Sequence, residues 1–233
     1  MLTATTPAPS PTLVVISGVI AALISAVTLV PRTSRVRRAV HSLNVLGTIV
    51  HEGGHAAVSC LTGGGAHVIQ IHTAGSGAAH VWAQTRWSAV ATQAAGYAAP
   101  ALAGLGAAAL LAGGHVPAVL AATIVAMVAV LLLTRDVFSA GCVAGIAALA
   151  ALVLWRGGVV VQQWVAYTET WMLLCSEITA VAHLGVRRIR GHETADDADA
   201  LAELTGLPWP VWITGWLTVI GWALWTAVPL LWP

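Results

Sequence analysis

The feature that most constrains this chain is a succession of apolar segments, each close to the length that crosses a lipid bilayer. A transmembrane helix needs about 20 consecutive apolar residues. The segments occupy residues 13–30, 40–62, 88–112, 116–133, 137–155, 159–184 and 209–232. Charged residues make up 8% of the chain, whereas about a quarter of a soluble domain is charged. We therefore predict an all-α polytopic membrane protein with about six to seven transmembrane helices.

The segments are expected to form a single integral membrane domain over residues 1–233, multi-pass in the cell membrane. The first helix would occupy 13–30, and no Lys or Arg precedes it. A cleavable signal peptide begins with a positively charged region, so we expect this helix to be retained. A core over 40–155 would follow, and then C-terminal helices over 159–232 that are interrupted by a polar linker at 185–208.

The polar linker contains its own helix signal. Thr194 is followed three residues later by Asp197, which resembles a capping box, and Gly206 would end the helix. We interpret this short helix as a solvated surface helix. The arginines divide evenly between the two sides of a seven-helix arrangement, so the positive-inside rule gives no orientation.

Composition excludes some classes of function and structure. The formal net charge is +1 and the chain has no lysine, so nothing indicates a nucleic-acid partner. Arginine without lysine, together with abundant alanine, is typical of bacteria of high genomic GC content. The three cysteines, Cys60, Cys142 and Cys175, lie in separate apolar segments. We expect each to be a small buried hydrophobic residue rather than a disulfide or metal ligand.

A β-hairpin is predicted after the second apolar segment, over about residues 66–85. Gly63–Gly65 would stop the preceding helix, and two extended runs flank the turn residues of "TAGSG". We place this hairpin at the membrane edge. Its histidines, His67, His72 and His80, are expected to face solvent or lipid headgroups rather than a metal.

The second segment contains the motif with the clearest chemistry. His51, Glu52 and His55 form H-E-x-x-H within "NVLGTIVHEGGHAAVSCLTGGG". On a helix, residues i and i+4 share a face, so both imidazoles can bind one Zn²⁺ while Glu52 reaches a metal-bound water as general base. Ionisable groups inside a membrane are costly and usually mark function. The alternative is that the three side chains only satisfy one another in the bundle core.

At these residues the chain resembles the intramembrane zinc metalloproteases of the site-2 protease type. More narrowly, it resembles the short bacterial members that lack a PDZ insert. It is strong over residues 44–86, through "TIVHEGGHAAVSCLTGGG" and "HVIQIHTAGSGAAHVW", and looser through "TRDVFSAG" and "DDADALAELTGLP". It implies zinc on His51 and His55, Glu52 as general base, a membrane-associated hairpin and a transmembrane peptide or membrane protein as substrate.

The third zinc ligand is not fixed by the motif. A catalytic zinc is held by three protein ligands and keeps one open position. The family's usual aspartate lies in an L-D-G motif on a later helix, and this sequence has no L-D-G. Asp136 is our first choice because it is the only carboxylate between Glu52 and Glu169. Glu177 and Asp197, in that order, are the alternatives, and Asp136 would otherwise cap a helix at the membrane boundary.

Small residues near the motif allow close approach. Gly53 and Gly54 each cost a helix about 1 kcal/mol relative to alanine, and bare backbone there would admit a neighbouring helix or a substrate strand. Gly96 and Gly104 would form a ridge for helix packing. Tyr97 beside this ridge could stabilise an oxyanion, but a structural hydrogen bond is the expected role of a buried tyrosine hydroxyl.

These observations favour an intramembrane zinc endopeptidase that hydrolyses membrane-embedded peptides, with a substrate strand that would pair with the hairpin. Two other functions remain open. A zinc transporter would need ligands along a path, yet His41, His115, His183 and His192 lie near segment ends. A non-catalytic zinc-binding membrane scaffold would keep the fold and bind only transmembrane helices.

Overall fold

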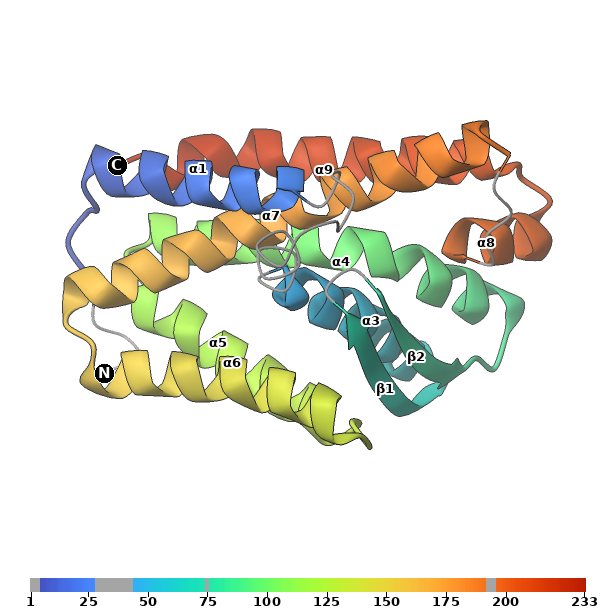
Figure 1. Ribbon diagram of the computed structural model, residues 1–233, viewed down its shortest axis with the longest axis horizontal. Helices are drawn as coiled ribbons and strands as arrows, with labels where there is room; N and C mark the ends of the chain where they lie inside the picture. The colour runs from blue at the N-terminus through green and yellow to red at the C-terminus, as the bar shows by residue number, and fades with distance from the viewer. Residues whose placement is uncertain (1–4, 28–43, 74–75, 192–195) are drawn as a thin grey trace.

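The chain forms a bundle of helices with one two-stranded sheet (Figure 1). The structure is a computed structural model, and it describes residues 5–27, 44–73, 76–191 and 196–233. The helices are α1 (Pro11–Val27), α3 (Val45–Leu61), α4 (Arg86–Ala112), α5 (Val116–Leu131), α6 (Val137–Arg156), α7 (Val159–Ile189), α8 (Asp197–Thr205) and α9 (Trp209–Leu231). The strands are β1 (Gly65–Thr73) and β2 (Ser76–Trp82). A mostly helical chain with one small sheet is therefore confirmed.

Three of the described helices are long and apolar enough to cross a membrane: α4, α6 and α9. Two shorter apolar helices lie at Pro11–Ala26 and Val116–Leu131. The α3 helix, which contains the H-E-x-x-H motif, has 17 residues. The count of six to seven crossings stays a prediction. The polar stretch around residues 31–38 lies outside the described residues.

Two hydrophobic clusters hold the bundle together. The larger cluster joins α1, α4, α7 and α9, and buried Trp216 and Leu174 belong to it. The smaller cluster joins α3, β1, α5 and α6 around Ile49, Ile69 and Val143. Burial of a large aliphatic side chain contributes about 1.5–3 kcal/mol in water. The α3 helix therefore has the smaller cluster on one face, while α4 packs against it from another side.

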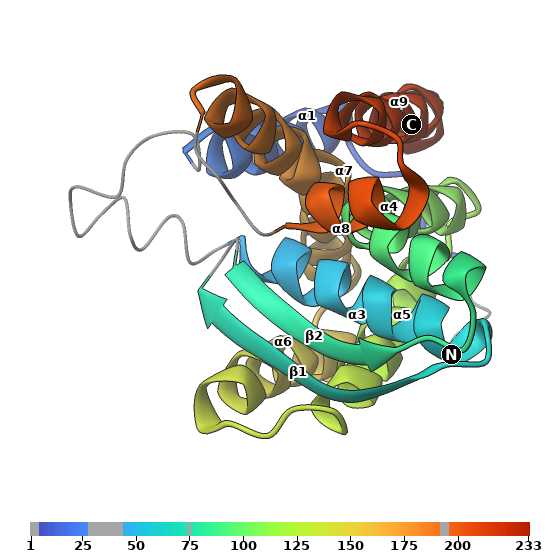
Figure 2. The same cartoon turned by 90° about the vertical axis from the view of Figure 1, so that its right-hand side faces the viewer.

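The hairpin runs alongside α3 (Figure 2). Its strands pair antiparallel, with Ile69 opposite Ala79. The buried Ser59 hydroxyl of α3 contacts the carbonyls of Trp82 and Gly65 at 2.7 and 3.0 Å, which fixes the open end of the hairpin to the helix. We expected the second extended run to begin at Ala78, after the turn residues, whereas β2 begins at Ser76; the hairpin itself is confirmed.

The outer edge of β1 is occupied by the connection between α5 and α6. The Ile69 N–H donates to the Leu133 carbonyl at 3.0 Å, and the Ile71 N–H donates to the Ser139 hydroxyl at 2.8 Å. The three hairpin histidines predicted to face outward, His67, His72 and His80, are all exposed.

The cysteines are free, as expected, but Cys60 is exposed on α3, and the prediction that it is buried is wrong. Cys142 and Cys175 are partly buried. Cys60 lies in the last turn of α3, beyond the part of that helix that the clusters cover.

Candidate metal centre

The H-E-x-x-H motif forms a continuous stretch of α3, so the predicted i and i+4 geometry is present. His55 and Glu52 are buried, each with 6% of its surface exposed, and His51 is partly buried. The two imidazole Nε2 atoms lie 3.3 Å apart. The rings meet edge to face, with an angle of 76° between their planes.

A carboxylate completes this pair. The Asp197 Oδ2 atom lies 3.2 Å from His51 Nε2 and 3.4 Å from His55 Nε2. His51, His55 and Asp197 thus form a triangle of possible metal ligands. In a tetrahedral zinc site with bonds of about 2.0–2.1 Å, neighbouring ligand atoms lie about 3.3–3.4 Å apart. The three measured edges match this spacing, so these donor atoms fit one such ion.

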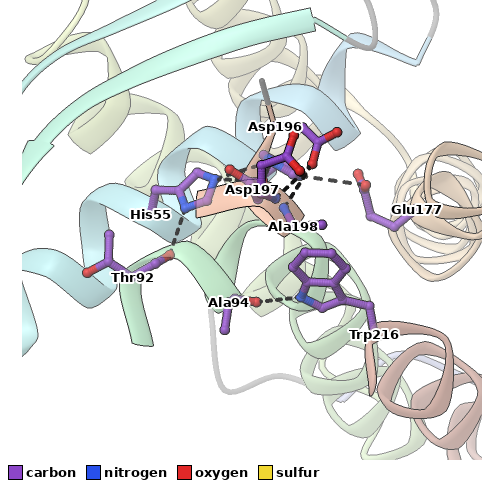
Figure 3. A network of polar contacts seen from close by, with 10 residues as sticks. His55, Thr92, Ala94, Glu177, Asp196, Asp197, Ala198 and Trp216 are labelled. Carbon is purple, nitrogen blue, oxygen red and sulfur yellow. Dashed lines mark hydrogen bonds and ion pairs between the residues drawn. The ribbon is translucent and has the colours of Figure 1, made fainter. Parts of the chain in front are cut away.

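The outward nitrogen of each imidazole also has a partner. His55 Nδ1 donates a 2.7 Å hydrogen bond to the Thr92 carbonyl of α4, which leaves its Nε2 lone pair free for a cation (Figure 3). His51 Nδ1 lies 3.6 Å from Glu177 Oε2 of α7. Partners of this kind fix the tautomer and the ring orientation of metal-binding histidines. Both rings therefore direct Nε2 toward Asp197.

Asp197 is the first residue of α8. The N-cap is Asp196, whose carboxylate accepts from the N–H groups of Ala198 and Asp199, and Gly206 ends the helix in the left-handed conformation at φ 76°. Burial opposes ionisation of Asp197, but hydrogen bonds with His51 and His55 hold the pKa of its carboxyl below the usual value. The carboxylate is therefore available as an anionic ligand.

Backbone of α4 lies directly against the imidazoles. A Cβ atom on Gly96 would lie 2.4 Å from His55 Nε2 and 2.6 Å from His51 Nε2. Gly96 therefore faces the candidate metal centre, whereas Gly104, its partner in the predicted ridge, packs against Leu174. The Tyr97 ring packs edge to face on His51, with centroids 4.6 Å apart, and this contact restrains the orientation of the His51 ring.

The donor atoms open on a cavity of about 410 Å³. Its walls come from α3, β2, α4, α7 and α8, and Glu52 and Tyr97 both line it. Strand β2 passes close over Glu52, because a Cβ on Gly77 would lie 2.8 Å from Glu52 Oε1. Ala79 of β2 lines the same cavity. The predicted acid, the histidines and the hairpin therefore meet in one cavity.

Asp136, our first choice for the third ligand, lies elsewhere. It is the N-cap of α6, where its carboxylate accepts from the Ser139 N–H at 2.8 Å and from the Ser139 hydroxyl at 2.6 Å. These hydrogen bonds lower the pKa of the Asp136 carboxyl. Through Ser139, Asp136 supports the edge of β1 rather than the imidazoles. Among the described residues, the group that could hold a metal contains Asp197 instead.

The position of α8 beside the two imidazoles was not predicted from the sequence. We expected a solvated helix there, and ranked Asp197 behind Glu177. Thr194, the predicted cap, lies outside the described residues, and Asp196 takes the N-cap position. Glu177 does reach the site, but it faces the outward nitrogen of His51 rather than the shared centre. One sequence signal could have pointed to Asp197. It is one of three aspartates at the start of α8, shortly after the arginines in the last turn of α7.

A comparison with known families agrees with this geometry. The chain matches the model of the Peptidase M50B-like family over residues 15–227, and it therefore belongs to that family. The family is one of metalloproteases of the site-2 protease type, which confirms the resemblance seen in the sequence. No curated protein and no solved structure matches the chain.

Proposed function

We propose that this protein is an intramembrane zinc endopeptidase that cleaves membrane-embedded peptides, multi-pass in the cell membrane. The observation that carries the proposal is the triangle of His51, His55 and Asp197 donor atoms, with edges of 3.2–3.4 Å, beside Glu52 in one cavity. Membership of a metalloprotease family and three helices fit to span a membrane support it further.

His51, His55 and Asp197 would hold the metal. Two neutral imidazoles and one carboxylate are a ligand set typical of catalytic zinc. When bound there, zinc would lower the pKa of a water to about 7 and polarise the scissile carbonyl. The Glu177 carboxylate and the Thr92 carbonyl hold the two rings in orientation through their outward nitrogens.

Glu52 would act as general base and then as general acid. Its carboxylate takes a proton from the attacking water and returns it to the nitrogen of the leaving amine. Strand β2, whose Gly77 lies against this carboxylate, would restrain its orientation. Because Glu52 is adjacent to His51 on α3, it lies at the same depth in the bundle as the ligands.

The substrate would bind in extended form along β2. A helical substrate hides its carbonyls in backbone hydrogen bonds, so the peptide must unwind before water can attack. In the described part of the chain, β1 uses its outer edge for the α5–α6 connection, whereas β2 lines the cavity that contains Glu52. Strand addition to β2 would bring a substrate carbonyl to the catalytic residues.

The decisive experiment compares two variants of the purified protein in proteoliposomes. The assay uses single-pass transmembrane peptides with a fluorophore and a quencher on either side of the segment, and metal content is measured in parallel. Glu52→Gln should retain about one zinc per chain and lose cleavage, because only the proton transfer is removed. His51→Ala should lose both. Glu203→Gln, which changes an exposed glutamate on α8, is the matched control and should behave as wild type.

Other outcomes separate the remaining functions. Continued cleavage by Glu52→Gln would refute the proposed role of this residue. Zinc flux into the liposomes that survives in Glu52→Gln would indicate a transporter. Bound zinc in the wild type without cleavage of any transmembrane peptide would indicate a scaffold.

A further inference from the structure

The position of Asp197 depends on a very short helix. α8 has nine residues and begins at Asp197, after residues 192–195, which lie outside the described part of the chain. Isolated helices shorter than about 12–15 residues are marginal in water, so α8 must be held in place by its neighbours. It packs against α4 and α9 with Ala198 and Leu201 buried. These apolar contacts hold the helix, but they do not set the direction of its first residue.

We propose that Arg188, in the last turn of α7, is the residue that positions Asp197 for metal binding. This inference rests on the proposed function, because it assigns Asp197 as the third ligand. The side chain of Arg188 is 8% exposed and forms ion pairs with Asp196 and with Asp199, the latter at 2.7 Å. The guanidinium thus binds the carboxylates on both sides of Asp197.

The ion pairs act through the N-cap of α8. The Asp196 oxygen that binds Arg188 also accepts from the Ala198 N–H at 2.9 Å and from the Asp199 N–H at 3.3 Å. Arg188 therefore fixes the cap, and the cap fixes the first turn of the helix. Because Asp197 lies between the two bound carboxylates, its own side chain is left to point toward His51 and His55.

Charge explains why this position requires an arginine. Asp196, Asp197 and Asp199 lie within four residues, and three carboxylates so close together repel one another. The planar guanidinium offers several donors in a fixed fork, so it can bind two carboxylates at once. It also keeps Asp196 and Asp199 from competing with Asp197 for a cation.

The neighbouring arginines provide a contrast. Arg187 and Arg190 are exposed, and neither forms an ion pair with any residue that the structure describes. At the other end of α8, the Arg86 Nε atom donates to the Leu204 carbonyl at 2.6 Å. Leu204 lies seven residues after Asp197 along α8, so Arg86 restrains the far end of the helix without orienting the ligand.

The test measures zinc affinity of the purified full-length protein by competition with a chromophoric chelator. Arg188→Ala should lower the affinity by about 10- to 100-fold, the loss typical for residues that orient metal ligands. Arg188→Lys keeps the charge but lacks the planar guanidinium, so its zinc affinity should lie between those of Arg188→Ala and wild type. Arg187→Ala is the matched control and should bind as wild type. With Co²⁺ in place of zinc, the visible spectrum of metal-bound Arg188→Ala should differ from that of wild type, because the Asp197 carboxylate is displaced.

The outcomes distinguish this inference from the proposed function. Wild-type affinity and an unchanged Co²⁺ spectrum in Arg188→Ala, together with loss of binding in Asp197→Ala, would overturn the role of Arg188 and leave the metal site intact. Failure of the wild-type protein to bind zinc would overturn both. If Arg188→Ala does not fold, Asp199→Asn removes one of the two ion pairs from a half-exposed carboxylate, and an unchanged affinity there would refute the inference.

Discussion

Replacement of Gly96 by alanine gives the sharpest test of the candidate metal centre. The added Cβ would lie 2.4 Å from His55 Nε2 and 2.6 Å from His51 Nε2. An ordinary contact between such atoms is about 3.5 Å, so the imidazoles or α4 must move by about 1 Å. Both rings direct these nitrogens toward the shared centre. A misplacement of that size can reduce activity by about 100-fold.

We therefore expect Gly96→Ala to lower zinc affinity and peptide cleavage by at least about 100-fold. The measurement is chelator competition for the metal and fluorescence dequenching for cleavage. Gly106→Ala on the same helix is the control, because nothing lies within 4 Å of its added Cβ. This variant should bind zinc as wild type and gain up to about 1 kcal/mol from helix propensity. Zinc binding and activity of Gly96→Ala equal to those of the control would refute the close approach of α4 to the imidazoles.

Four further substitutions test three separate contacts. Gly77→Ala places a Cβ 2.8 Å from the Glu52 carboxylate, so cleavage should fall by about 100-fold while zinc content stays at wild-type level; loss of zinc instead would contradict the assignment of this contact. Gly54→Ala should lower the melting temperature, because its Cβ would lie 2.5 Å from a side chain of α4 and overpacking costs about 1–3 kcal/mol. Gly53→Ala, with its nearest atom at 3.4 Å, should melt no lower than wild type, and equal melting of the two variants would argue against the tight helix contact. Asp136→Ala should lower the melting temperature by loss of the α6 cap but leave zinc affinity unchanged, and a fall in affinity would restore it as a ligand candidate.

Local sequence patterns were enough to predict half of the site. His51, Glu52 and His55 lie within five residues of one helix, so the period of the helix alone brings them together. The hairpin was predictable for a similar reason, because glycines and turn residues bound two extended runs. Features that depend only on residues close together along the chain could be predicted from the sequence.

The third member of the triangle could not be predicted in this way. Asp197 lies 146 residues from His51 along the chain, and only the packing of α8 on α4 and α9 brings it to the imidazoles. Asp136 looked more suitable because it stands alone among apolar segments, but its oxygens are used by Ser139. The sequence leaves several carboxylates as candidates for the third ligand. Only tertiary contacts show which of them lies beside the imidazoles.

The role of Gly96 was likewise hidden. A glycine in an apolar helix predicts close packing, but the sequence does not say against what. We predicted a ridge with Gly104 for helix packing, whereas the structure places Gly96 against two imidazoles and Gly104 against α7. A hydropathy pattern shows that a helix face consists of small, apolar residues. Only the fold shows which residues pack against that face.

The distance along the chain between α3 and α8 has a consequence for biosynthesis. A ribosome makes the two histidines early, but more than half of the polypeptide must still be translated before Asp197 exists. Until then, a nascent chain carries only a pair of imidazoles and cannot close a three-ligand centre. Under the proposed function, the protein would become active only after α8 has packed on α4 and α9, late in its synthesis.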